Sequence, residues 1–75
     1  MGKLPQISGK EMGRVLVRLG FVCVSQRGSH MKFVRKHDSG KEIIIVPNHA
    51  ILRKGTLNDI IKKLNLRIEE FKKFL

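Results

Sequence analysis

The stretch RGSHMKFVRKHDSGKEIIIVP, residues 27–47, decides the fold class of this chain. Polar and apolar side chains alternate from His30 to Lys36, and a period of two residues is that of a β-strand. The alternation predicts two strand faces of different chemistry. One face is basic (His30, Lys32 and Lys36, with Val34 as the exception), and the other is mainly apolar (Met31, Phe33 and Arg35).

Two further strands are predicted beside this one. Residues 38–40, Asp-Ser-Gly, form a turn, and the β-rich run 42–46 follows it and ends at Pro47. That run is apolar on both faces, so we expect a central or well-covered strand. The β-branched and aromatic residues of 21–26 predict the other strand, which the tight connection 27–29 joins to His30. Strands joined by short turns pair antiparallel.

Amphipathic helices are predicted on both sides of the strands. Residues 8–11, Ser-Gly-Lys-Glu, have the capping-box pattern, and Gly20 suits the left-handed position that ends a helix. A second helix is predicted to follow an N-cap at Thr56, with Asp59 near its positive end. Asn65 is expected to end it, and a short helix follows. The apolar positions are Met12, Val15, Leu16 and Leu19, then Leu57, Ile60, Ile61 and Leu64, then Ile68, Phe71 and Leu75.

The order of these elements predicts an α+β fold: a helix, a three-stranded antiparallel sheet, a helix and a short C-terminal helix. This is the plan of a double-stranded-RNA-binding domain, although a plan alone does not fix a function. A chain of 75 residues has room for one thin core, so we expect a single domain over residues 1–75. The helices must cover one face of the sheet because their apolar stripes need burial, and the other face is then available for basic side chains.

The charge balance points to an anionic partner. Lys and Arg number 16 and Asp and Glu number 6, which gives a formal net charge of +10. Such a field attracts nucleic acid, anionic membrane or acidic protein. The longest apolar run, residues 43–47, is far shorter than the roughly 20 residues of a membrane-spanning helix, and we see no secretory signal. The one cysteine, Cys23, stands between two valines, so we expect a buried core thiol rather than a nucleophile, in a reducing cytoplasmic setting.

His30 is the strongest candidate for chemistry. It follows a flexible turn of Gly28 and Ser29 and shares its predicted face with lysines. An imidazole can accept a proton from a ribose 2′-hydroxyl or donate one to a leaving oxygen near neutral pH, while neighbouring cations hold the phosphate. From composition and spacing alone, an ordinary surface histidine remains the simpler interpretation.

The other two histidines are weaker candidates. We expect His37 to be a turn residue with a local hydrogen bond. His49 can approach His30 if the end of the third strand lies near the start of the second, and a role in stabilising its own loop is an equal alternative. Paired cysteines, helix-spaced histidines and a glycine-rich phosphate loop are absent from the sequence, so we expect neither a metal nor a cofactor.

Five short motifs follow one another along almost the whole chain: residues 19–21 (Leu-Gly-Phe), 27–30 (Arg-Gly-Ser-His), 46–49 (Val-Pro-Asn-His), 54–57 (Lys-Gly-Thr-Leu) and 68–71 (Ile-Glu-Glu-Phe). Together they resemble the HicA toxins of type II toxin–antitoxin systems. The resemblance implies a double-stranded-RNA-binding-like fold, a ribosome-independent mRNA interferase activity, and a cognate HicB antitoxin that covers the toxin's active face. It places the family's catalytic histidine on His30 and the turn that presents it on Gly28 and Ser29.

The chain departs from the family pattern in two places. Arg67 occupies a position where a Ser or Thr helix cap is expected, and the loop at residues 50–53 is more apolar than usual. Neither change touches His30, so they bear on how the partner docks rather than on catalysis.

The sequence therefore predicts a cytoplasmic toxin that cleaves mRNA by metal-independent acid–base catalysis at His30, with His49 as a candidate accessory residue. An RNA-binding module without catalysis is the alternative, and an interaction domain for an acidic protein is a third. The expected partners are mRNA and a HicB-like antitoxin, with no membrane and no small-molecule cofactor. The predicted RNA-contacting residues are Arg27, Gly28, Ser29, Lys32, Lys36 and Lys54.

Overall fold

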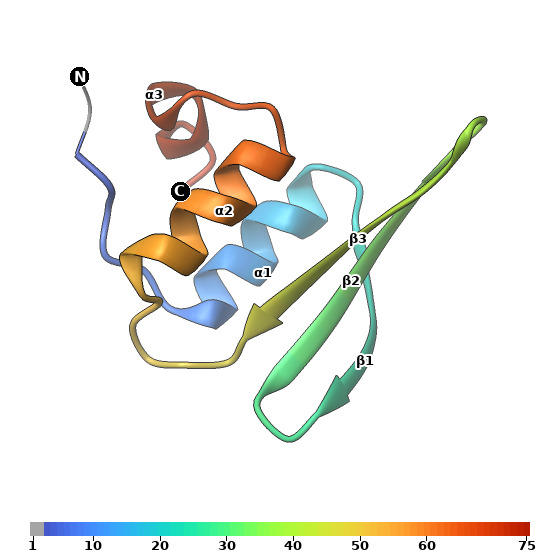
Figure 1. Ribbon diagram of the computed structural model, residues 1–75, viewed down its shortest axis with the longest axis horizontal. Coiled ribbons are helices and arrows are strands. Elements are labelled where there is room, and N and C mark those ends of the chain that lie inside the picture. Colours follow the sequence, from blue (N-terminus) through green and yellow to red (C-terminus); the bar gives the residue numbers. More distant parts are fainter. Residues whose placement is uncertain (1–2) are drawn as a thin grey trace.

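The computed structural model describes residues 3–75 and has helices gathered on one side of an antiparallel sheet (Figure 1). The strands are hydrogen-bonded in the order β1-β2-β3. The predicted α+β architecture is thus confirmed, and it agrees with the plan of a double-stranded-RNA-binding domain. The elements in chain order are α1 (Gly9–Arg18), β1 (Val22–Arg27), β2 (His30–His37), β3 (Gly40–Pro47), α2 (Lys54–Lys63) and α3 (Ile68–Lys72).

Helix α1 begins at the predicted capping box. The Glu11 N–H donates to Ser8 Oγ, and the Ser8 N–H donates to the Glu11 carboxylate, both at 3.0 Å. The bond from the Ser8 backbone lowers the pKa of Glu11 below its ordinary 4.5. Gly20 follows the helix with φ 96°, the left-handed conformation predicted there.

Strand β2 is the centre of the sheet, and its predicted alternation is confirmed. Met31 and Phe33 are buried in the core beneath the helices, whereas His30 is exposed on the other face. Arg35 lies on the helix side and is held there by polar partners. Its Nη2 donates to Glu42 Oε1 of β3 at 2.8 Å, its Nη1 donates to the Leu19 carbonyl at 2.8 Å, and its guanidinium lies over the Phe21 ring.

The prediction that residues 42–46 form a central or well-covered strand is wrong. The strand order places β3 at an edge of the sheet, and the helices cover only the face that carries Ile44 and Val46. On the other face, Ile43 and Ile45 are 40% and 45% exposed. The sequence of an apolar strand does not show whether its second face is covered by another element or open to solvent.

The prediction of a buried thiol at Cys23 is also wrong. Every residue of β1 is exposed, Cys23 included. Strand β1 is the other edge of the sheet, and Figure 1 shows α2 and α3 on the side of α1 away from it. The valines on either side of Cys23 in the sequence therefore do not show that a helix covers this strand.

Helix α2 begins at Lys54, earlier than predicted, so the assignment of Thr56 as its N-cap is wrong. Arg53 is the N-cap, and its carbonyl accepts from the Leu57 N–H at 2.9 Å. The chain can turn into a helix this early because the buried Leu52 donates its N–H to the Ile7 carbonyl at 2.8 Å and fixes the approach. Asp59 therefore lies beyond the first turn, which holds no acidic residue.

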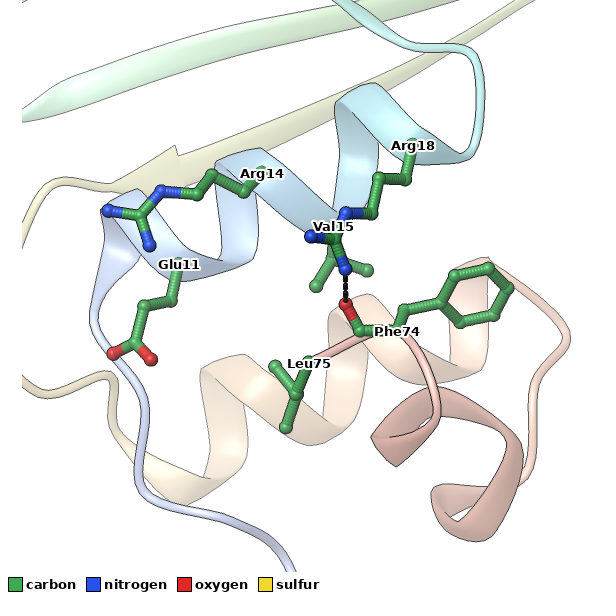
Figure 2. Close-up of a pocket in the computed structure, with 6 residues that line it drawn as sticks. All are labelled: Glu11, Arg14, Val15, Arg18, Phe74 and Leu75. Carbon is green, nitrogen blue, oxygen red and sulfur yellow. Dashed lines mark hydrogen bonds between the residues drawn. The ribbon is translucent and has the colours of Figure 1, made fainter.

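The C-terminal segment packs back against α1. Asn65 has φ 57°, as expected for the residue that ends α2, and Phe71 of α3 is fully buried. Figure 2 shows Arg18 reaching the carbonyl of Phe74, with Nη1 donating at 2.7 Å. Leu75 lies beyond the end of α3 and is exposed, so its predicted place on the helix is wrong.

Replacement of Gly9 by alanine should destabilise the fold. A Cβ built on Gly9 would run into the Pro47 carbonyl oxygen and lie 2.9 Å from the Asn48 Cα, both of them backbone atoms. We expect Gly9→Ala to lower the free energy of unfolding by about 2–3 kcal/mol, measured by chemical denaturation. Gly55→Ala is the matched control: its Cβ meets nothing within 4 Å, and a helical alanine should raise stability by about 0.5–1 kcal/mol. Equal effects of the two variants would contradict this account of the α1–β3 contact.

Two carboxylates that accept from backbone N–H groups at helix N-termini, those of Glu11 and Glu70, should make the protein sensitive to acid. Hydrogen bonds from the backbones of Ser8 and Arg67 lower the pKa values of Glu11 and Glu70 below 4.5. A carboxyl whose pKa is lower in the folded state contributes its stability above the unfolded pKa and loses it as pH falls through the folded one. We expect Glu11→Gln to destabilise the protein at pH 7 but much less at pH 2–3, as followed by thermal unfolding. An equal loss at both pH values would show that the carboxylate charge is unimportant.

Candidate active site

His30 begins β2 immediately after a two-residue turn. Gly28, with φ 56°, supplies the backbone conformation that such a turn needs, and Arg27 pairs with His30 across it. On the other side His30 pairs with Pro47 of β3. We call the sheet face that carries His30, away from the helices, the outer face. Within residues 3–75 the exposed imidazole makes no hydrogen bond or ion pair, so its ring is available to a ligand.

A β-bulge in β1 sets which side chains share the outer face with His30. Cys23 pairs with Phe33 and Ser25 pairs with Lys32, so Val24 is an extra residue in the ladder. Regular alternation from Cys23 would turn Ser25 and Arg27 toward the helices. The bulge shifts the register by one residue and places both of them on the outer face.

These residues line one shallow hollow of about 330 Å³ on the outer face. Two cations flank the imidazole, and no carboxylate lines the hollow, so its potential favours an anion. The lining residues are Ser25, Arg27, His30, Lys32 and Ile45.

Ser25 and Ile45 were missed by sequence reasoning. The bulge that aims Ser25 outward leaves no signature in the residue types, since Val24 looks like any other strand residue. Ile45 was assigned to a covered strand, and its exposure follows only from the strand order.

The structure does not bring the remaining predicted cations into this hollow. Lys36 is on the outer face but six residues along β2 from His30, a distance of about 20 Å, where it pairs with Lys41. Lys54 is the exposed first residue of α2 and lies outside the hollow. Lys36 and Lys54 can therefore extend a basic surface, whereas Arg27 and Lys32 belong to the immediate surroundings of His30.

His49 lies in a loop that is tied to the same end of the molecule. The Asn48 N–H donates to the Ser29 carbonyl, and the His49 carbonyl accepts from the Gly9 N–H at 2.9 Å. The His49 backbone thus stabilises its loop, while participation of its exposed ring in catalysis stays a prediction. His37 has the local hydrogen bond expected of it, between Nδ1 and Ser39 Oγ at 3.1 Å, but it is the last residue of β2 rather than a turn residue, so that part of the prediction is wrong.

Metal ligands do not gather in the described part of the chain. Over residues 3–75, no group of three or more His, Cys, Asp or Glu side chains is placed to hold an ion. No helix in this range is long and apolar enough to cross a membrane.

The class of protein is a small α+β domain with the plan of a double-stranded-RNA-binding domain. It carries an exposed histidine between cations on the sheet face that the helices leave uncovered. The profile of the family described as the HicA toxin of bacterial toxin–antitoxin systems matches residues 9–66. The chain therefore belongs to the HicA toxin family. Membership of this family implies an RNA target and a HicB antitoxin as partner. No curated protein matches the chain.

Proposed function

We propose that this toxin is an endoribonuclease, an mRNA interferase, with His30 as its general acid or base. The observation that carries the proposal is the exposed imidazole of His30, which has no partner within residues 3–75 and lies in one hollow with Arg27 and Lys32. A histidine with only a structural role would be expected to hold a hydrogen bond, as His37 does with Ser39.

The reaction that suits this site is transesterification by the neighbouring ribose hydroxyl. The 2′-oxygen attacks phosphorus as its proton passes to a base, the bond to the 5′-oxygen breaks, and that oxygen takes up a proton. The products are a 2′,3′-cyclic phosphate and a 5′-hydroxyl. Imidazole can act in either proton transfer near neutral pH. Arg27 and Lys32 stabilise the charge that develops on the phosphate oxygens, so the reaction needs no metal.

The surface favours contacts to the RNA backbone rather than stacking on bases. The chain has no Trp or Tyr, and Phe21, Phe33 and Phe71 are buried in the core. Without aromatic platforms, single-stranded or weakly structured mRNA would be held through its phosphates. Gly28 and Ser29, which have small side chains, would let the backbone of the turn approach the RNA strand closely. Lys36 and Lys54 would extend the basic surface.

The same charge supports a protein partner. A net charge of +10 favours an acidic protein that competes with RNA, and we propose a HicB-like antitoxin in that role. We further propose that residues 1–75 act as one domain in the cytoplasm, where mRNA is found.

Replacement of His30 should remove cleavage without removing the fold. We expect His30→Ala to slow cleavage of a single-stranded RNA by about 10²–10⁴-fold, the usual contribution of positioned acid–base catalysis. Wild-type cleavage should persist in excess chelator. The measurement is a gel assay with an end-labelled RNA, and His37→Ala, at the far end of β2, is the matched control.

The outcomes separate this proposal from its alternative. If wild-type protein binds RNA but does not cut it, and His30→Ala binds equally well, the chain is an RNA-binding module. If His30→Ala still cuts, His30 is not the catalytic residue. Loss of wild-type cleavage in chelator would replace the mechanism with a metal-dependent one.

The two lysines of the outer face should differ although their charge is the same. We expect Lys32→Ala to lower kcat/KM about tenfold or more, because Lys32 lies beside His30 and stabilises the transition state. Lys36→Ala should mainly weaken RNA binding and lower the salt dependence of binding by about one phosphate contact. Cleavage kinetics and fluorescence titrations at several salt concentrations measure these effects. Equal losses in kcat/KM would contradict the placement of Lys36 outside the hollow.

A further inference from the structure

A second surface feature lies on the helix side of the sheet, away from His30. It is a groove of about 560 Å³ between α1 and β1. Its floor is apolar and consists of Met31 and Phe33 of β2, which here lie at the edge of the core. Its rim on α1 is basic. The residues that line it are Lys10, Gly13, Arg14, Val17, Arg18, Cys23, Met31 and Phe33.

The groove exists because one flank of α1 has no neighbouring helix. Figure 1 shows α2 and α3 on the flank away from β1, and Figure 2 shows Phe74 and Leu75 beside α1 on that filled side. On the β1 flank, Val17 of the helix is 57% exposed and Cys23 of the strand is exposed. Apolar side chains thus face the groove from both of its walls.

The chemistry of the groove argues against RNA and against a second copy as its occupant. RNA has no aliphatic side chains to fill an apolar floor. A second copy would bring another charge of +10 to a rim that already carries the cations of Lys10 and Arg14, and like charges repel. The groove instead suits apolar side chains flanked by carboxylates.

The spacing of the cations on the rim indicates that the partner segment is a helix. Lys10 and Arg14 lie four residues apart on α1, about 6 Å along the helix axis, whereas the Arg18 guanidinium donates to the Phe74 carbonyl on the other flank. Carboxylates at the same interval on a neighbouring helix would meet Lys10 and Arg14 in register. A helix about 10 Å wide laid beside α1 would also complete the helix layer over β1.

We propose that this groove receives an acidic amphipathic helix of the antitoxin. The proposal rests on the proposed function only for the identity of the partner. The docking mode is that of an apolar helix face laid into a groove, with the exposed Val17 as its apolar contact beside a floor of the largely buried Met31 and Phe33. The groove and His30 are on opposite faces of β2, so this contact holds the partner without touching the catalytic hollow.

Cys23 makes the proposal directly testable. It is the only cysteine in the chain, it is exposed, and it lines the groove. We expect a thiol-reactive aromatic disulfide to modify Cys23 readily in the full-length toxin, carrying His30→Ala so that it can be produced. In the complex with a HicB-like antitoxin, modification should slow by about tenfold or more. A short single-stranded RNA should leave the rate unchanged.

Two groove variants and one control test the contact energetically. Val17→Asp places a charge on the apolar wall, and Lys10→Glu reverses a rim charge. Each should weaken the complex by about tenfold or more, measured by titration calorimetry. Lys63→Glu on α2, which changes the net charge by the same amount as Lys10→Glu but lies outside the groove, should bind as the parent does. In the catalytically intact chain, Lys10→Glu should leave RNA cleavage unchanged.

Each remaining outcome overturns the inference. Unchanged Cys23 reactivity in the complex would place the partner elsewhere, and protection by RNA would make the groove an RNA site. If Lys10→Glu and Lys63→Glu weaken the complex equally, the effect is due to net charge and not to a contact in the groove. If the two proteins do not associate, the inference is wrong whatever the RNA assay shows. If they associate through the groove but RNA is not cut, only the proposed enzymatic function is wrong.

Discussion

The pleat of β2 is the constraint on which the rest of the structure depends. Successive side chains of a strand point to opposite faces, so Met31 and Phe33 enter the core while His30 and Lys32 remain on the outer face. A slip of one residue would bury the imidazole and the lysine and expose the phenylalanine. The continuous pairing of β2 with β3 and the tight turn before His30 hold the register that prevents this.

Features encoded by neighbouring residues could be predicted from the sequence. The capping box at residues 8–11, the two faces of β2 and the left-handed Gly20 all follow from local patterns, and the structure has them. Coverage could not be predicted in this way. Cys23 and the outward side of β3 were expected to be buried because they are apolar or lie between valines, but both are on edge strands that the helices leave open.

In the candidate site, too, the contacts between residues close in sequence could be predicted, and those that depend on strand pairing could not. His30, Arg27 and Lys32 stand close together in the sequence, so a turn and one strand suffice to predict that they meet. Ser25 joins them only because of the bulge at Val24, which depends on how β1 pairs with β2. Lys36 has the right charge and the right face, yet strand length carries it away from His30. Face and distance are thus separate questions, and periodicity answers only the first.

The core of residues 3–75 fills the single layer between helices and sheet, and His30 lies outside it on the surface. The His30 side chain is exposed on the outer face, and no lid covers it within residues 3–75. If His30 cleaves RNA as proposed, control of that activity would have to come from a second molecule. A basic groove on the face opposite His30 would let that molecule gain affinity from contacts that play no part in catalysis, so recognition and cleavage could vary independently.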